Sequence, residues 1–251
     1  MAGRRAFLAF AGLGLAYWGA RSVVPSLWAS YGALPEMTRA GMPEGFRKMA
    51  GEAQFSGGLA NPLIGLDRQA APLPPLSDGD MCQALFSQGD GRLALSYFTD
   101  YQCPYCRVLG RDLKQLAAAR ADRLELSYHE LPLLGPGSVI GAKAALAARK
   151  QGAYDDMHRL LNTGVVRINQ AYVEKIGSEL GLDLGKLRAD MEGPGVARAL
   201  VTSQAIADRF AVIGTPFLLI GRTAIYGRIS PELLDRLATA ELARRAPDRC
   251  V

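Results

Sequence analysis

Two cysteines three residues apart stand where an expected strand meets an expected helix, and this placement constrains the fold more than any other feature. The segment reads Cys103-Pro104-Tyr105-Cys106. Residues 93–98 before it form a short apolar run, which is typical of a buried strand. After it, Leu109 and Leu113 continue one face at helical spacing from Cys106. The sequence therefore predicts that Cys103 lies at the N-terminus of a helix.

This position suits redox chemistry. Unpaired backbone N–H groups and the helix dipole favour a thiolate at Cys103. A lowered pKa makes Cys103 a better nucleophile at neutral pH and a better leaving group. Cys106 lies one turn further along, where we expect it to be buried and suited to resolving a mixed disulfide. Pro104 lacks a backbone N–H and fits the first turn of a helix.

Zinc binding and an incidental or purely structural cysteine pair are the alternative interpretations. Tetrahedral zinc needs two further ligands. The other cysteines and histidines, which are Cys82, Cys250, His129 and His158, are isolated in the sequence. Four cysteines in 251 residues are also too few for a disulfide-dense small fold. We therefore expect a redox pair, no metal site and no cofactor beyond the Cys103–Cys106 disulfide itself.

The N-terminus has the pattern of an export signal. Residues 6–20 are uncharged and mostly apolar, and they lie between Arg4-Arg5 and Arg21. A helix of this length spans about 22 Å, less than the roughly 30 Å of a bilayer core. We expect residues 1–22 to be a cleaved signal, with a membrane anchor as the alternative. The paired arginines also resemble a twin-arginine signal, although paired arginines occur in ordinary signals too.

The net charge of +5 comes mostly from this segment, because residues 1–22 hold three basic residues and no acidic residue. The rest of the chain has no run of Lys and Arg. We therefore expect no nucleic-acid partner. The predicted location is the periplasm, either free after signal cleavage or tethered to the inner membrane by residues 6–20.

Residues 23–80 are predicted to be an irregular extension or linker, punctuated by Gly and Pro, with a short helix possible over residues 44–53. The main domain is expected over residues 81–250. After the first helix, residues 124–131 alternate as a strand, and residues 138–210 read as four helical segments. Residues 217–220 and 223–226 read as a hairpin, followed by a helix that starts at Ser230-Pro231. The order predicts an α/β fold with a small mixed sheet.

The residues around the cysteine pair resemble a known family. Residues 98–107, which read FTDYQCPYCR, look like the active-site segment of the DsbA-like thioredoxin-fold proteins of the bacterial envelope. Gly214-Thr215-Pro216-Phe217 is similar to the loop that carries the family's cis-proline. The helical block, about residues 136–211, matches the family's inserted helical domain. The resemblance therefore implies a thioredoxin fold, a small mixed sheet flanked by helices, with an all-helical insertion.

The resemblance also implies roles for individual residues. Cys103 would link to the substrate and Cys106 would resolve the mixed disulfide. Pro104 and Tyr105 between them would tune the redox potential. Thr215 and the cis-proline Pro216 would bind substrate, with the Thr215 backbone pairing an extended segment as an added strand.

Other polar residues have less specific interpretations. Cys82 and Cys250 flank the domain and could form a structural disulfide, but sequence does not fix such a pairing. Asp100 is most simply a polar loop residue, although it could shift the pKa of Cys103. His129-Glu130 is expected to be a solvated pair, and His158 is expected at the surface or partly packed.

These observations predict a thiol:disulfide oxidoreductase that acts on exported proteins with free or mispaired cysteines. Disulfide formation by an oxidase is the favoured direction. An isomerase or reductase of the same fold is the first alternative, and a non-enzymatic envelope chaperone or assembly factor is the second. By analogy with the family, the redox partner would be a membrane protein, either a quinone-linked oxidant or a thiol reductant.

Overall fold

A computed structural model describes residues 33–50, 54–57, 76–86, 91–164 and 167–244. The chain divides into two units, Met1–Pro35 and Glu36–Val251. The expected export signal lies outside the described residues. Among the residues of the five described ranges, no helix is long and apolar enough to cross a membrane.

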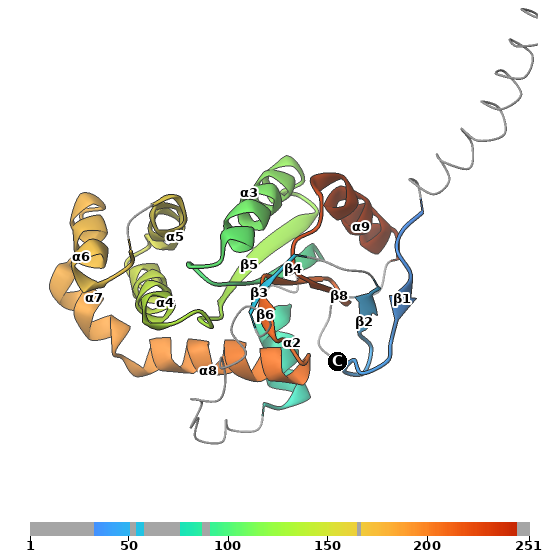
Figure 1. Cartoon of the computed structure of the whole chain (residues 1–251), viewed down its shortest axis with the longest axis horizontal. Coiled ribbons are helices and arrows are strands. Elements are labelled where there is room, and N and C mark those ends of the chain that lie inside the picture. The colour runs from blue at the N-terminus through green and yellow to red at the C-terminus, as the bar shows by residue number, and fades with distance from the viewer. Residues whose placement is uncertain (1–32, 51–53, 58–75, 87–90, 165–166, 245–251) are drawn as a thin grey trace, which may run out of the picture. The chain divides into compact units, whose positions relative to one another are not determined.

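A six-stranded sheet in the order β1-β2-β8-β7-β4-β5 forms the centre of the second unit (Figure 1). β4 pairs in parallel with β5 and antiparallel with β7, and β7 and β8 form the predicted hairpin. The six strands are β1 (Met37–Thr38), β2 (Arg47–Met49), β4 (Leu93–Thr99), β5 (Leu124–Glu130), β7 (Phe217–Ile220) and β8 (Thr223–Tyr226). The predicted mixed sheet is therefore confirmed.

Helices cover both faces of this sheet. In Figure 1, α3 (Pro104–Ala119) and α9 (Pro231–Ala243) lie on one side, while α2 (Asp78–Leu85) and the end of α8 (Pro194–Arg209) lie on the other. All seven residues of β4 are consequently buried. This burial explains why β4 reads as an almost continuous apolar run rather than an alternating one.

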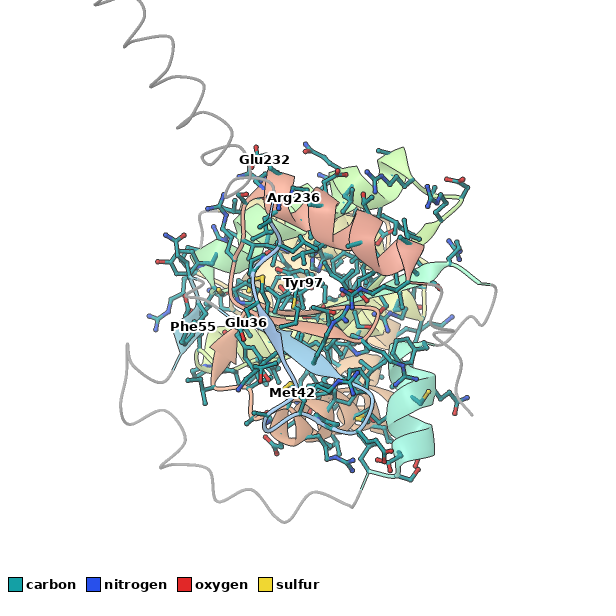
Figure 2. All side chains as sticks on the ribbon, turned by 90° about the vertical axis from the view of Figure 1, so that its right-hand side faces the viewer. Glu36, Met42, Phe55, Tyr97, Glu232 and Arg236 are labelled. Atoms are coloured by element: carbon teal, nitrogen blue, oxygen red, sulfur yellow. The ribbon has the colours of Figure 1, made fainter. Side chains whose placement is uncertain are left out.

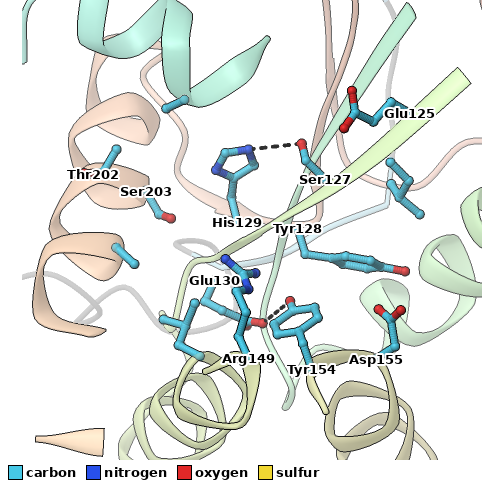
Figure 3. Close-up of a pocket in the computed structure, with 14 residues that line it drawn as sticks. Glu125, Ser127, Tyr128, His129, Glu130, Arg149, Tyr154, Asp155, Thr202 and Ser203 are labelled. Atoms are coloured by element: carbon cyan, nitrogen blue, oxygen red, sulfur yellow. Dashed lines mark hydrogen bonds between the residues drawn. The ribbon is translucent and has the colours of Figure 1, made fainter. Parts of the chain in front are cut away.

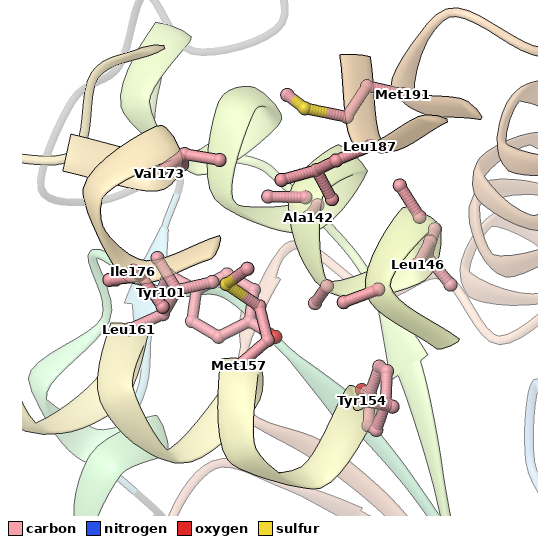
Figure 4. Close-up of a cluster of buried hydrophobic side chains, with 14 of the residues drawn as sticks. Tyr101, Ala142, Leu146, Tyr154, Met157, Leu161, Val173, Ile176, Leu187 and Met191 are labelled. Carbon is pink, nitrogen blue, oxygen red and sulfur yellow. The ribbon is translucent and has the colours of Figure 1, made fainter. Parts of the chain in front are cut away.

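The inserted helices pack around a core of their own. They are α4 (Pro136–Arg149), α5 (Tyr154–Thr163), α6 (Gln170–Glu179), α7 (Leu184–Met191) and the first part of α8. Small alanines along α4 let the neighbouring helices approach closely, and larger side chains such as Met157 and Leu187 fill the space between them (Figure 4). Tyr101, from the loop that precedes the cysteine pair, also enters this core and ties it to the active-site segment.

The helix expected over residues 44–53 is wrong. Gly45 has a positive φ of 78°, which interrupts a helix there, and Arg47–Met49 instead pair in parallel with β8. The Phe46 ring packs edge-on against Phe210 at 4.9 Å and anchors the new strand. Part of the expected irregular extension thus belongs to the sheet.

A second short sheet lies beside the active site. β3 (Ser56–Gly57) pairs antiparallel with β6 (Gly214–Thr215), immediately before Pro216. Neither strand was predicted, because two residues are too few to show a hydrophobic period.

Candidate active site

The two cysteines lie at the start of α3, where the sequence predicts them. Cys103 is the N-cap residue, and its sulfur accepts a hydrogen bond from the Cys106 backbone N–H at 3.3 Å. Pro104 follows as the first helical residue, where the absence of an N–H costs nothing. Both cysteines are free thiols in this structure.

The pKa values of the two thiols are shifted in opposite directions. A hydrogen bond from the Cys106 thiol is the main cause that lowers the pKa of Cys103, to about 6, and Ser56 lowers it further while burial opposes the shift. Burial is the main cause that raises the pKa of Cys106 well above its usual value. At neutral pH the pair therefore holds one thiolate, on Cys103, and one proton, on Cys106.

The loop before β7 meets this pair. Cys103 Sγ lies 3.2 Å from the carbonyl oxygen of Thr215, and the Thr215–Pro216 peptide bond is cis. The fold thus brings Thr215, the residue before the cis-proline, against Cys103 across more than one hundred residues of sequence. Between the two cysteines, Pro104 is exposed and Tyr105 is half-buried.

The buried carboxylate of Asp100 holds the active-site loop in place. The sequence did not indicate this structural role. Asp100 accepts hydrogen bonds from the backbone N–H groups of Gln102, Leu133 and Leu134 and from the Ser138 hydroxyl, at 2.6–2.9 Å. Burial nevertheless raises its pKa. Asp100 therefore joins the cysteine loop to the start of α4; it is the polar loop residue that was expected, but it is buried.

A second buried network lies behind the same loop. Glu130 accepts hydrogen bonds from the hydroxyls of Tyr101 and Tyr154 at 2.8 and 2.6 Å. The Tyr101 hydroxyl also lies 2.8 Å from His158 Nδ1. Glu130 is buried and His158 nearly so, because helices of the insertion cover both. The expectation of a solvated His129-Glu130 pair is therefore wrong for Glu130, and His158, expected at the surface or partly packed, is buried.

A cavity of about 440 Å³ opens beside β5, between that strand and α4, α5 and α8 (Figure 3). His129, Arg149 and Asp155 are among its lining residues. Burial lowers the pKa of His129 to about 4, so this imidazole is neutral at neutral pH. The lining includes neither Cys103 nor Cys106, so the cavity is separate from the redox pair.

Cys82 lies on α2 and forms a disulfide. Cys250 lies outside the described residues, and its pairing with Cys82 stays a prediction. Within the ranges the structure describes, no group of three or more His, Cys, Asp or Glu residues could hold a metal ion.

A thiolate at a helix N-terminus, a protonated partner thiol one turn away and a cis-proline loop against them, all on a thioredoxin-like sheet, define a thiol:disulfide oxidoreductase. Comparison with known families agrees with this class. Residues 94–238 match the DSBA-like thioredoxin domain, and the chain belongs to this family.

Solved structures share the fold. A thioredoxin-like oxidoreductase from Silicibacter pomeroyi DSS-3 is 33% identical, with a TM-score of 0.58 over 63% of this chain and 96% of that one. The thiol-disulfide exchange protein alpha-DsbA2 from Wolbachia pipientis is 21% identical, with a TM-score of 0.58 over 63% of this chain and 90% of that one. Proteus mirabilis ScsC in a transitional conformation is 22% identical, with a TM-score of 0.60 over 74% and 89% of the two chains.

The curated relatives are much longer proteins. A Na(+)/H(+) antiporter NhaA 3 from Salinispora tropica is 26% identical over 58% of this chain, and a NhaA 1 antiporter from Salinispora arenicola is 27% identical over 61%. The matches span only 22% and 25% of those proteins. The likeness therefore concerns one part of each antiporter.

Proposed function

We propose that this protein is an oxidase that introduces disulfides into exported proteins through Cys103 and Cys106. The observation that carries the direction is the N-cap position of Cys103, whose sulfur accepts a hydrogen bond from the Cys106 backbone N–H at 3.3 Å and whose pKa is lowered to about 6, mainly by the Cys106 thiol. A stabilised thiolate favours the reduced form of the pair, so the oxidised pair gives up its disulfide readily to a substrate.

Electrons and protons are exchanged only between the Cys103–Cys106 pair and one pair of substrate cysteines. A substrate thiolate attacks Cys103 Sγ of the oxidised pair, the Cys103–Cys106 bond breaks, and Cys106 leaves and takes up a proton. The second substrate thiolate then attacks the substrate sulfur of the mixed disulfide and expels Cys103 as a thiolate. Two electrons pass from substrate to enzyme, and the substrate gains one disulfide.

The chain's residues have distinct roles in this cycle. Cys103 is the substrate-linked and leaving sulfur, and buried Cys106 resolves adducts that stall. Pro104 and Tyr105 set the surroundings of the pair and so tune its potential. Thr215 and Pro216 bind the substrate, whose extended segment pairs with the Thr215 backbone.

The proposed location is the periplasm. The apolar N-terminal pattern of residues 6–20 supports export, and the Cys82 disulfide suits an oxidising compartment. Reoxidation then needs a membrane partner, for which we propose a quinone-linked oxidant. In the isomerase or reductase alternative, a thiol reductant would take its place.

Oxidative refolding of a reduced, disulfide-containing test protein checks the proposal. With the pre-oxidised enzyme as sole oxidant, the substrate should gain one disulfide for each Cys103–Cys106 pair consumed. Cys103→Ser should abolish this transfer. An enzyme that reshuffles mispaired disulfides but transfers none to a fully reduced substrate would overturn the oxidase assignment and favour the isomerase.

A further inference from the structure

The sulfur that must exchange with substrates is closed off. Cys103 has an exposed fraction of 0%. Thiol–disulfide exchange needs direct approach of an attacking sulfur along the bond that breaks. Whatever covers Cys103 must therefore move before a protein substrate can react.

One cover is the chain's own segment Gln54–Gly57, which we call the strap. Ser56 lies opposite Thr215 and Gly57 lies opposite Gly214 in an antiparallel pair. This is the same short strand whose Thr215 carbonyl contacts Cys103 Sγ. The strap thus fills the strand position that an extended substrate would take beside the cis-proline.

The strap is held closely on this edge. A Cβ atom placed on Gly214 would lie 2.6 Å from the Ser56 carbonyl oxygen and 2.7 Å from the Phe55 ring, so the contact requires glycine. At the other end, the Arg228 backbone N–H donates to the Gln54 carbonyl oxygen at 2.7 Å. Figure 2 shows Phe55 at the margin of the unit and the buried Tyr97 in its middle.

Ser56 lies opposite Thr215, the residue whose carbonyl oxygen is 3.2 Å from Cys103 Sγ. The Ser56 side chain is also one of the hydrogen-bonding groups that lower the pKa of Cys103. Serine is the oxygen counterpart of cysteine, with the same length and branching. A substrate cysteine at this register would bring its own sulfur to the place that the Ser56 hydroxyl holds.

We propose that the strap is an intramolecular pseudosubstrate, with Ser56 in the position of the substrate cysteine, and that protein substrates react only after displacing it. The inference rests on the proposed thiol exchange, though not on its direction. It names the site's partner as an extended peptide that pairs antiparallel with Gly214–Thr215 and presents a cysteine where Ser56 now lies.

A cysteine introduced at position 56 tests the geometry. In a full-length S56C/C106A variant, oxidised glutathione should convert the two thiols at positions 56 and 103 into one intramolecular disulfide, releasing two molecules of reduced glutathione. The product should be 2 Da lighter than its reduced form, and peptide mapping should link the two positions. Q54C/C106A is the matched control, since Gln54 is exposed and pairs with Arg228 rather than with Thr215, and the Phe55 ring is kept.

The control should instead carry glutathione on Cys103. An S56C/C106A variant that behaves like this control would overturn the assigned position of Ser56. Disulfide formation between positions 56 and 103 depends only on where the two sulfurs lie. A negative result here is therefore distinct from failure of the oxidase proposal, which the substrate-refolding experiment measures.

Displacing the strap tests its effect on access. G214A should force the strap away and raise the alkylation rate of Cys103 in the reduced full chain at least about tenfold, because reaction would no longer wait for local opening. F55A should act in the same direction from the strap's side. G79A on α2, where a Cβ meets only the Ser77 hydroxyl at 3.8 Å, is the control and should change nothing. Unchanged alkylation in folded G214A and F55A would overturn the pseudosubstrate.

Discussion

The Cys103 thiol lies 3.2 Å from the carbonyl oxygen of Thr215, a residue 112 positions further along the chain. This contact joins the start of α3 to the cis-proline loop, so the reactive sulfur and the strand edge that would bind a peptide form one site. Because the same edge also carries the strap, the proposals above predict that acidity, peptide binding and access to the sulfur are coupled at Thr215.

The acidity of Cys103 should appear directly in its reactivity. Since the thiolate is the nucleophile, the alkylation rate should rise with pH through a midpoint near 6 and level off above about pH 7. Cys106 should react slowly throughout this range, because burial keeps it protonated. Mass spectrometry of reduced protein pulsed with iodoacetamide from pH 4 to 9 measures both. A midpoint above pH 8 would contradict the described hydrogen bonds to Cys103.

The same shift should make the stability of the reduced protein depend on pH. The pKa of Cys103 in the folded protein lies below that of an unfolded cysteine, so ionised Cys103 stabilises the fold. This stabilisation is fully present above about pH 8.5 and is lost as pH falls through 6. The oxidised protein lacks this titration. The melting temperature of the reduced form should therefore rise relative to that of the oxidised form as pH rises from 5 to 8, below the range in which the raised pKa of Cys106 opposes the effect. Parallel curves would count against the assignment.

The Asp100 carboxylate should be a large stability contributor. D100N would turn an amide N–H₂ toward a site where four donors converge, and should lower the free energy of unfolding by about 1–3 kcal/mol. Urea denaturation of the full chain measures the loss. D122N, at an exposed position, is the matched control and should lie within about 0.5 kcal/mol of the parent protein. Equal stability of both variants would show that the Asp100 network contributes little.

The hydroxyl of Tyr101 should link the active-site loop to the inserted helices. Y101F removes one hydrogen bond to buried Glu130 and one contact with His158, and should cost about 1–2 kcal/mol of unfolding free energy. Y172F, on half-buried Tyr172 of α6, serves as control. If the two variants lose equal stability, the network around Glu130 does not hold the active-site loop to the inserted helices.

The sequence predicted where the two cysteines lie in the fold because its signals are local. A strand, a CxxC segment and a helical face follow one another within about twenty residues, so the sequence places Cys103 at a helix N-terminus. The backbone N–H of Cys106 there is one of the groups that lower the pKa of Cys103, after the Cys106 thiol itself. The hairpin at 217–226 and the capped start of α9 are also local patterns, and both are confirmed.

The parts that were missed depend on contacts distant in sequence. Asp100 reads as a loop residue until the chain from Leu133 to Ser138 folds back onto it. Glu130 reads as solvated until α5 covers it with Tyr154. Ser56 stands in a stretch without periodicity, and only its pairing with Thr215 reveals a strand.

The redox potential of the Cys103–Cys106 pair tests the central claim most directly. Equilibrating the full chain with defined ratios of reduced and oxidised glutathione, and quantifying the two thiols by alkylation, gives this value. The thiolate-stabilised pair should be more oxidising than about −200 mV, in the range of proteins that donate disulfides. A potential near the roughly −270 mV of thioredoxin would contradict the oxidase and assign the pair to reduction.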